Sequence, residues 1–324
     1  MAAIKLFFKM LRPQIALALL IFAAIGMAQG GKVSQLQWQF LWVTLIIVSW
    51  WINATCINDI ADYEIDKINL KGSAERPLAN KQASKQQIIY LYILSALSAL
   101  GIGFATDIKI GILVAICLLL NYLYSMPPIR ISYRGALASI LLPVGYVLLP
   151  FLVGTWSVGD TLTHDGRLIL AALYISFVGR ILLKDFRDVE GDSKFGKMTF
   201  LLRYGRKATC ISSALGLSVG VVILLFVLPD NFVVRLVFIC LWLCTIFGLY
   251  KLYKTRGRKA ELIIISSIVK SASGAVIILL AILLLENNQK PISQQVLVSA
   301  ALGLYSIALF WDTISRVNKI YIQT

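Results

Sequence analysis

Ten apolar stretches, each about as long as a membrane crossing, follow one another along the chain. A helix that crosses a bilayer needs roughly 17 to 25 mostly apolar residues. The stretches cover approximately residues 13–30, 37–57, 87–105, 109–125, 136–156, 167–183, 208–228, 232–250, 262–285 and 292–314. We therefore predict an all-α fold, a polytopic transmembrane helical bundle that forms a single domain over residues 1–324.

The composition favours this prediction over a soluble protein. Apolar residues make up 59% of the chain, and the mean hydropathy is +0.81. Soluble globular domains contain roughly 45–50% apolar residues. A chain of 324 residues could instead form two soluble domains, but the hydropathy excludes that alternative.

Basic residues gather on one side of the predicted helices. If the N-terminus is cytoplasmic, the loops on that side carry 24 of the 31 Lys and Arg residues, which is the asymmetry typical of cytoplasmic loops. We expect a multi-pass protein of the cell inner membrane with both termini inside. Orientation and attraction to the lipid bilayer then explain the net charge of +15, and nucleic acid is not an expected partner.

Half of the acidic residues fall in two short clusters that share one spacing. The pattern D-x-x-D-x-E-x-D is formed first by Asp59, Asp62, Glu64 and Asp66, then by Asp185, Asp188, Glu190 and Asp192. Each member of the second cluster lies 126 positions after its counterpart, which predicts an internal duplication. Carboxylates this close repel one another unless a cation holds them together, so the pattern indicates a metal site built from two halves.

On one helix, aspartates at i, i+3 and i+7 lie within about 60° of one another, so each cluster presents them on one face. Glu64 and Glu190, at i+5, point away and are secondary candidates. Both clusters begin at the cytoplasmic end of a predicted span, in segments near 58–86 and 184–207. Hard oxygen ligands of this kind suit Mg²⁺, which binds through a few carboxylates plus substrate phosphates. The alternative is that both are solvated loop starts, and the repeated spacing argues against it.

Cysteine and histidine offer no second metal or redox site. The five cysteines fall in or at the edge of apolar spans without a C-x-x-C pair, and the single histidine, His164, lies in a predicted outer loop. Free cysteine packs as a small hydrophobe, so we expect core packing.

Three motifs resemble those of the UbiA-type intramembrane prenyltransferases. The first is NDIADYEID at 58–66 followed by ERPL at 75–78, similar to N-D-x-x-D-x-x-x-D and R-P-L of that family. KDFRDVEGD at 184–192 resembles the family's second aspartate motif, and YSMPPIR at 124–130 resembles its Y-S-x-P-P-x-R stretch. The family is usually described with nine spans, whereas this sequence shows ten, so the resemblance implies a bundle of nine or ten helices around a central apolar chamber.

The resemblance implies Mg²⁺-dependent transfer of a prenyl group from an allylic prenyl diphosphate to an acceptor. Metal ions and cations would stabilise the charge that develops on the leaving diphosphate. Asp59, Asp62 and Asp66 would hold one metal set and Asp185, Asp188 and Asp192 the other. Asn58 would be an additional oxygen ligand or orienting donor, and Lys184 stands at its place in the second repeat.

Several cations and aromatic side chains are candidates for contacts with the substrate. Arg76, Arg130 and Lys194 lie at or near the motifs and would bind the diphosphate, or else act as headgroup or topology charges. Tyr124 is the main candidate for stabilising an allylic cation through its ring, and Trp50 and Trp51 are weaker ones.

Two cations lie inside predicted spans, where charge is costly and marks a polar cavity or a carboxylate partner. Arg180 could pair with a cluster or reach the rim, and Lys270 is predicted to face the chamber and help position the acceptor.

The acceptor is the least constrained part of the prediction. A small aromatic ring is favoured because it is common in the family, whose other members use chlorophyll precursors, haem or glycerol-phosphate lipids. A cyclase of the same superfamily is one alternative. A phosphoribosyl transferase is another, but we would expect its second cluster to be altered, whereas all three aspartates are present here. From another class, a ten-helix solute transporter would place its acidic residues near the bilayer midplane.

Overall fold

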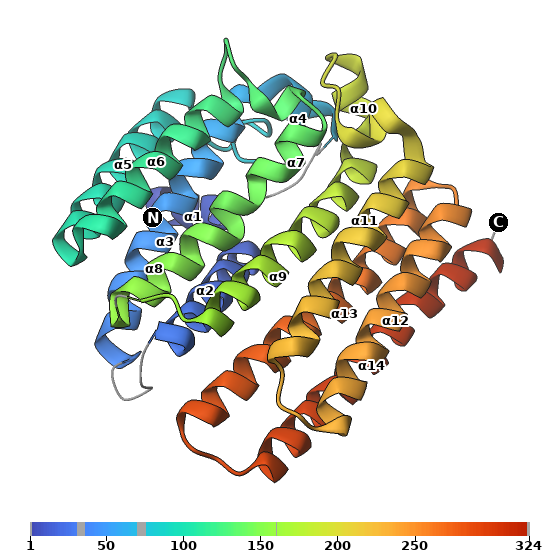
Figure 1. Ribbon diagram of the computed structural model, residues 1–324. Coiled ribbons are helices and arrows are strands. Elements are labelled where there is room, and N and C mark those ends of the chain that lie inside the picture. Colours follow the sequence, from blue (N-terminus) through green and yellow to red (C-terminus); the bar gives the residue numbers. More distant parts are fainter. Residues whose placement is uncertain (1, 31–35, 70–75, 160, 323–324) are drawn as a thin grey trace. The chain divides into compact units, whose positions relative to one another are not determined.

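A computed structural model describes residues 2–30, 36–69, 76–159 and 161–322, all helical apart from short connections (Figure 1). The chain divides into two compact units. The first unit contains Met1–Thr161 and Asp188–Leu202, and the second contains Leu162–Arg187 and Arg203–Thr324. The first unit is therefore discontinuous, because the chain leaves it at Thr161 and returns to it at Asp188.

The first unit is built from eight helices and the end of a ninth. They are α1 (Ala2–Leu11), α2 (Pro13–Gly30), α3 (Leu36–Ala61), α4 (Tyr63–Asn69), α5 (Lys85–Thr106), α6 (Ile108–Ser125), α7 (Ala136–Pro143) and α8 (Leu149–Val158), followed by the later part of α10 (Asp185–Lys194). The largest helix contacts join α2 to α8, α3 to α5 and α5 to α6.

The second unit begins with α9 (His164–Ile181), the short turn η4 (Leu182–Lys184) and the start of α10. It continues with α11 (Phe200–Val227), α12 (Phe232–Lys254), α13 (Arg258–Asn287) and α14 (Ile292–Ile322). Helices α12, α13 and α14 pack side by side.

Ten helical segments among the described residues are long and apolar enough to cross a membrane, as predicted. Most of their limits fall within a few residues of those expected from sequence. The sixth is longer, His164–Lys194, because η4 and α10 continue it past the predicted end at 183. The seventh begins at Phe200 and not at 208, but Gly205 breaks its helical geometry with a φ of 78°, so the regular helix starts close to the predicted position.

The fifth crossing, Ala136–Val158, contains a widened turn in its middle. Residues Val144–Leu148 form a π-helical turn between α7 and α8, next to Pro143 and Pro150. Proline lacks the amide hydrogen that a regular helix needs, so a local change of pitch is expected there. The turn includes Gly145, where a Cβ would lie 2.5 Å from the ring of Trp50.

Small residues let helices approach closely in both units. In the first unit, a Cβ on Gly26 of α2 would lie 2.0 Å from the carbonyl oxygen of Phe151 in α8. In the second, a Cβ on Gly179 of α9 would lie 2.7 Å from the carbonyl oxygen of Ser213 in α11. Close backbone contact of this kind is how membrane helices associate, because lipid tails provide no hydrophobic drive.

The cysteines pack in the protein interior, as predicted. All five are free thiols; Cys56, Cys117, Cys210 and Cys244 are buried and Cys240 is half-buried. Cys117 belongs to the apolar core that Trp50 and Trp51 share with α2, α3 and α6, and Cys56 belongs to a second cluster with Met10 and Leu78. Both tryptophans are almost fully buried, which favours a packing role for them.

Candidate active site

The first acidic cluster lies across a break between two helices. Asp59 is in the last turn of α3, Asp62 lies in the break after Ala61, and Asp66 is in α4. This corrects the expectation of one continuous helix. Two backbone hydrogen bonds of Asp62 still have helical i to i+4 spacing. Asp62 N donates to Asn58 O at 2.8 Å, and Asp66 N donates to Asp62 O at 2.8 Å. All three carboxylates are buried in the first unit.

The second acidic cluster begins after its helix break. The 3₁₀ turn η4 ends α9, and Asp185, Asp188 and Asp192 all belong to α10. Asp185 and Asp192 are buried and Asp188 is half-buried. Asp185 belongs to the second unit, whereas Asp188 and Asp192 belong to the first.

Lys197 connects the two acidic clusters inside the first unit. Its Nζ lies 3.0 Å from Asp62 Oδ2 and 3.7 Å from Asp192 Oδ1, and its side chain is buried. Asn69, at the end of α4, adds two hydrogen bonds: its Nδ2 donates to Asp192 Oδ1 at 3.5 Å and its Oδ1 accepts from Gly191 N at 2.7 Å. Segments more than 120 residues apart in sequence therefore meet at these carboxylates.

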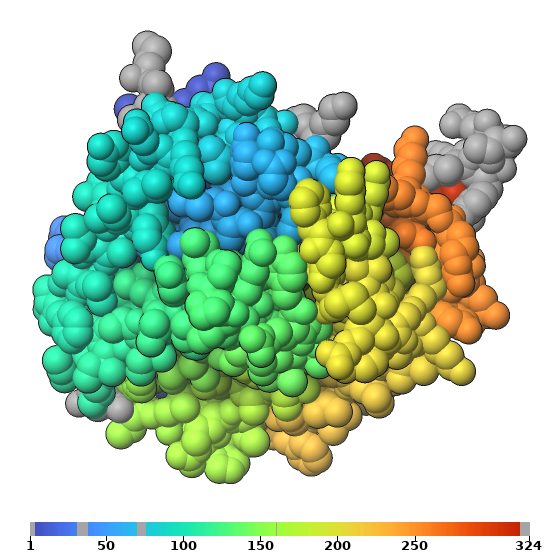
Figure 2. All heavy atoms as spheres, turned by 90° about the horizontal axis from the view of Figure 1, so that it is seen from above, coloured from blue at the N-terminus to red at the C-terminus, as the bar shows by residue number. Residues whose placement is uncertain are grey.

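The chain segment after α10 reaches this site through a turn at Gly196, where φ is 67°. Lys197 N donates to Asp192 O at 2.8 Å, and Met198 forms a parallel bridge with Arg134. In the view from above, the yellow residues of this segment adjoin green residues of the segment that contains Arg134 (Figure 2). The ring of Tyr133 lies 4.0 Å from the Arg130 guanidinium and 6.0 Å from Lys197 Nζ.

Three arginines face the first cluster. Arg12 Nη2 lies 2.6 Å from Asp59 Oδ1, and Arg76 contacts both Asp59 Oδ1 at 2.7 Å and Asp66 Oδ2 at 2.8 Å. Arg130 donates to the Ala61 carbonyl at 2.9 Å and lies 3.8 Å from Asp62 Oδ1. Arg12 and Arg130 both have left-handed backbone, with φ of 45° and 43°, a conformation that non-glycine residues adopt rarely and that often accompanies a functional site.

The carboxylates of this cluster favour a cation strongly. Burial, together with repulsion from Asp59 and Asp62, raises the pKa of Asp66 to about 8. Among the residues that the structure describes, no donor makes a hydrogen bond to Asp59 Oδ2, although this atom is buried. Buried carboxylate oxygens are the donor type that Mg²⁺ prefers, so the chemistry of the residues fits that ion.

The arginines and Lys197 already occupy several of these oxygens. Consequently no group of three acidic, His or Cys side chains in the described part of the chain is arranged to enclose a metal ion. The donor set fits Mg²⁺, and the present arrangement is one in which side-chain cations balance the carboxylates.

The other predicted residues lie in different surroundings. Asn58 Nδ2 donates to Asp62 Oδ2 at 3.1 Å, and Lys184 Nζ lies 3.3 Å from Asp185 Oδ1. Glu64 is exposed and pairs with Lys67 at 2.9 Å, and Glu190 is also exposed. Glu75 of the E-R-P-L motif lies outside the described residues.

Lys194 is exposed at the end of α10, whereas Lys197 is buried at the carboxylates. Tyr124 is half-buried near the end of α6. In the second unit, Lys270 Nζ donates to Thr313 Oγ1 at 2.6 Å, which joins α13 to α14, and the Arg180 guanidinium lies 5.7 Å from the Phe177 ring.

Sequence analysis missed three residues at this site: Arg12, Asn69 and Lys197. The signal for Arg12 is its position directly before Pro13, at the start of the first span. Gly196 was the signal for Lys197, because a glycine one residue earlier allows the left-handed turn that brings this lysine back to the cluster. Asn69 had no comparable local signal.

The chain matches a known protein family over most of its length. The family described as "UbiA prenyltransferase family" matches residues 17–268, which include every predicted site residue except Lys270. The chain belongs to the UbiA prenyltransferase family. The resemblance noted from the three motifs is thereby confirmed.

Curated relatives in this family differ in the acceptor that their names imply. The chloroplastic chlorophyll synthase of Avena sativa is 32% identical over 46% of this chain and 40% of its own length. The digeranylgeranylglyceryl phosphate synthase of Thermococcus kodakarensis is 30% identical over 65% of this chain and 73% of its own. Homogentisate phytyltransferase of Synechocystis is 30% identical over 47% of this chain and 50% of its own. The match thus spans less than half of the length of the chlorophyll synthases.

Solved UbiA structures share the fold. A digeranylgeranylglyceryl phosphate synthase structure gives a TM-score of 0.65 at 18% identity, covering 88% of this chain and 99% of the other. A UbiA homolog from Archaeoglobus fulgidus bound to GPP and Mg²⁺ gives a TM-score of 0.55 at 17% identity, covering 95% and 99%. These likenesses establish the all-helical UbiA-like architecture of the chain.

Proposed function

We propose that this chain is an intramembrane prenyltransferase that transfers a prenyl group from an allylic prenyl diphosphate to an acceptor with the help of Mg²⁺. Lys197 is the observation that carries this proposal. Its Nζ lies between Asp62 of the first motif and Asp192 of the second, so both motifs contribute to one buried, charged site. The Archaeoglobus fulgidus homolog bound to GPP and Mg²⁺ supports the choice of ligands.

Bond cleavage between carbon and oxygen leaves negative charge on the diphosphate oxygens. Mg²⁺ held by the aspartates of both motifs would supply positive charge to this leaving group. Arg12, Arg76 and Lys197 bring further positive charge to the same place, because each already contacts a motif carboxylate. Preorganised charges in a buried site stabilise a transition state more strongly than the same charges would in water, because water screens them less there.

We also propose, from the second motif, that Asp185 is a metal ligand. Arg130 is proposed to contact the diphosphate and Asn58 to act as an orienting donor. We also keep Tyr124 as the residue that stabilises the allylic cation, because an aromatic face attracts positive charge and a bilayer-embedded site keeps out water that would quench it.

The acceptor is proposed to be a small aromatic compound, in line with the homogentisate phytyltransferase relative. A glycerol-phosphate lipid is a second candidate. Two observations support this second candidate. One digeranylgeranylglyceryl phosphate synthase is matched over 73% of its length, and the structure of another such synthase gives the TM-score of 0.65.

The membrane and the orientation are also part of this proposal. We infer an inner-membrane protein with both acidic motifs on the cytoplasmic side, because the basic loops gather there. Labelling of a single cysteine introduced at exposed Glu64 by a membrane-impermeant maleimide, in cells and in inverted vesicles, tests the orientation. Labelling only in inverted vesicles is expected.

Purified full-length protein in detergent, with Mg²⁺ and a panel of prenyl diphosphates, tests the chemistry. Asp62→Asn and Asp192→Asn should each reduce diphosphate release by at least about 100-fold, because each removes charge from the site. Glu64→Gln is the matched control, since Glu64 is an exposed carboxylate of the same motif. Equal release from all three variants would refute the two-motif site.

Product analysis in the same reactions separates the acceptors. Hydroxybenzoate-like acids and glycerol-phosphate lipids are supplied separately, and mass spectrometry identifies any prenylated product. A cyclised hydrocarbon formed from the diphosphate alone would contradict transfer and favour the cyclase alternative.

A further inference from the structure

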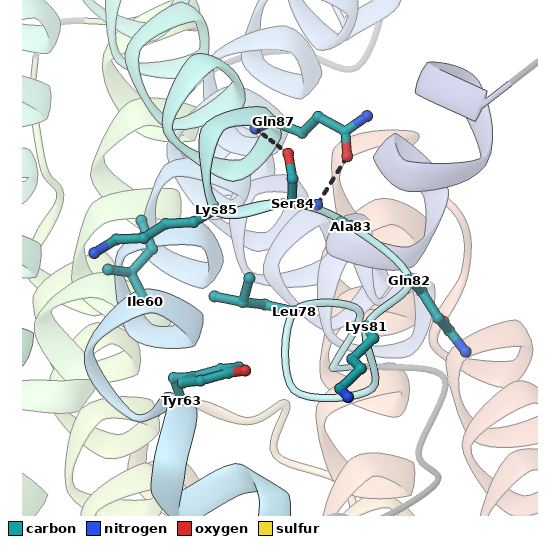
Figure 3. A pocket seen from close by; sticks show the side chains of 9 residues that line it. All are labelled: Ile60, Tyr63, Leu78, Lys81, Gln82, Ala83, Ser84, Lys85 and Gln87. Carbon is teal, nitrogen blue, oxygen red and sulfur yellow. Dashed lines mark hydrogen bonds between the residues drawn. The ribbon is translucent and has the colours of Figure 1, made fainter.

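A cavity of about 650 Å³ lies in the first unit, beside the start of α5 (Figure 3). It is lined by the end of α3, by Tyr63 at the start of α4, by the loop before α5 and by the first turn of α5. The residues used in the following argument are Ile60, Tyr63, Leu78, Lys81, Ser84 and Lys85. The described lining contains no carboxylate, so this cavity is distinct from the acidic site.

The polar side of the cavity is positively charged. Lys81 and Lys85 both line it and are exposed. Lys9 of α1 donates to the side chain of Gln82, which also lines it, and this brings a third ammonium group nearby. An anion is the complementary ligand for such a set of charges.

The N-terminus of α5 adds to this field. Ser84 caps the helix: its Oγ accepts from Gln87 N at 3.2 Å, and Gln87 Oε1 accepts from Ser84 N at 2.9 Å. This capping box fixes the helix start at the cavity. The aligned peptide dipoles of the 22-residue helix place partial positive charge at the same end.

Apolar side chains also line the cavity. Ile60 and Leu78 belong to this part of the lining (Figure 3). On the outer surface of α5, Tyr90, Leu94 and Leu97 are 72%, 63% and 62% exposed. Their i, i+4, i+7 spacing puts them on one helical face, which begins about one turn beyond the cavity.

Helix α1 has the character of a helix that lies at the membrane surface. It carries exposed Ile4 and Phe8, spaced i, i+4 on one face, and Lys5 and Lys9 with the same spacing on the neighbouring face. Helices of this kind lie in the interface plane and favour anionic lipids. Because Lys9 contacts Gln82, the cavity lies at the level of α1.

We propose that this cavity binds the phosphate headgroup of an anionic membrane phospholipid, with an acyl chain along the Tyr90, Leu94 and Leu97 face of α5. The lysines and the start of α5 bind the phosphate, and Ile60 and Leu78 contact the glycerol region. A soluble phosphate or diphosphate would satisfy the cations but would leave the apolar wall and the α5 face unused. A lipid uses both.

Lipid retention tests this proposal directly. The full chain is extracted from vesicles of phosphatidylcholine with a minor fraction of phosphatidylglycerol, and native mass spectrometry counts the phosphatidylglycerol that stays bound. Lys81→Gln/Lys85→Gln should weaken retention roughly 30-fold, the effect expected for two lysines near anionic lipid. Lys81→Arg/Lys85→Arg should retain the lipid, because the charge is kept.

The matched control is Lys207→Gln/Lys259→Gln, which removes the same charge from two exposed lysines of the second unit. It should leave retention unchanged. Equal retention in both Gln variants would overturn the proposal, and so would an equal loss in both, since general surface charge would then explain binding. Thermal unfolding of each variant checks that the fold is intact.

Inorganic phosphate and diphosphate distinguish the source of the anion. Added without Mg²⁺ at concentrations above that of the lipid, they should displace little phosphatidylglycerol. Efficient displacement by either would assign the cavity to a soluble anion and overturn the lipid assignment. The assay contains no prenyl substrate, so its failure would leave the proposed transferase function untouched.

Discussion

The two acidic motifs share their spacing but differ in how they meet a helix break. In the first, Asp59 precedes the break after Ala61, Asp62 lies in it and Asp66 follows it. In the second, all three aspartates follow the 3₁₀ turn that ends α9. A duplicated sequence pattern has therefore been fitted to two different local backbones, and the two motifs are not structural copies of each other.

The two motifs also differ in the side chains that surround their carboxylates. The first motif is held by Arg12, Arg76 and Lys197, which come from three separate segments of the first unit. In the second unit, a long-range ion pair joins Arg206 to Glu261, and the guanidinium of Arg206 lies 4.9 Å from the ring of Phe186, the neighbour of Asp185. The cations of the first motif thus come from distant segments, whereas Asp185 pairs with its sequence neighbour Lys184 at 3.3 Å.

The largest effect is expected from Lys197→Met, which removes the tie between the motifs. It leaves Asp62 and Asp192 buried without this partner, and losing one member of a buried pair costs about 3–5 kcal/mol. Thermal unfolding in detergent measures the loss. Lys194→Met is the control, because Lys194 is exposed and should change stability by less than about 0.5 kcal/mol. Similar shifts in both would show that the bridge is not structural.

Arg206→Ala tests the second unit by the same logic. Besides Glu261, Arg206 donates to the carbonyl oxygens of Leu252 at 2.6 Å and Thr255 at 2.8 Å, so α11 is tied to the end of α12 and the start of α13. We expect a loss of about 3 kcal/mol, the lower end for a buried pair because both side chains retain some exposure. Arg206→Lys should recover only part of it, since lysine lacks the planar fork. Full recovery would contradict this assignment.

Gly26→Ala tests the close approach of α2 to α8. The new Cβ would collide with the Phe151 carbonyl, so we expect a loss of about 1–3 kcal/mol from overpacking. Gly179→Ala should cost less, because its nearest backbone atom is farther away. Gly101→Ala meets nothing within 4 Å and should stabilise α5 by about 0.5–1 kcal/mol. A destabilising Gly101→Ala would mean that helix packing is not the cause.

The smallest effect is expected from Glu64→Gln and Glu190→Gln. Both side chains are exposed, and the Glu64 pair with Lys67 is a surface ion pair worth less than about 1 kcal/mol. Diphosphate release should stay within about twofold of the original protein, because surface substitutions usually change free energies by less than about 0.5 kcal/mol. A large loss in Glu190→Gln alone would show that the second motif uses its glutamate, in contrast to the first.

The spans could be predicted from the sequence because apolar length is a local property of the chain. The limits of the first span, for example, agree residue for residue with α2, which begins at Pro13 and ends at Gly30. The carboxylate clusters and Arg76 were predictable for a similar reason, since spacing and a short motif identify them. The break at Asp62 was not, because the aspartate spacing fits one continuous helix equally well.

The partners of the carboxylates were harder to predict. Arg12 lies 47 positions before Asp59, and Lys197 lies 135 positions after Asp62, so each pair depends on how several helices fold together. In sequence, Lys194 lies closer than Lys197 to the second motif. The left-handed turn at Gly196 reverses that order in space.

The distance in sequence between Asp62 and Lys197 has a consequence for biogenesis. Asp62 is synthesised before the third crossing, but its partner Lys197 follows 135 residues later, after the sixth. Until the sixth crossing has been synthesised, the acidic cluster therefore lacks the positive charge of Lys197. Truncated chains that stop before residue 197 should therefore be preferred substrates for membrane quality-control proteases.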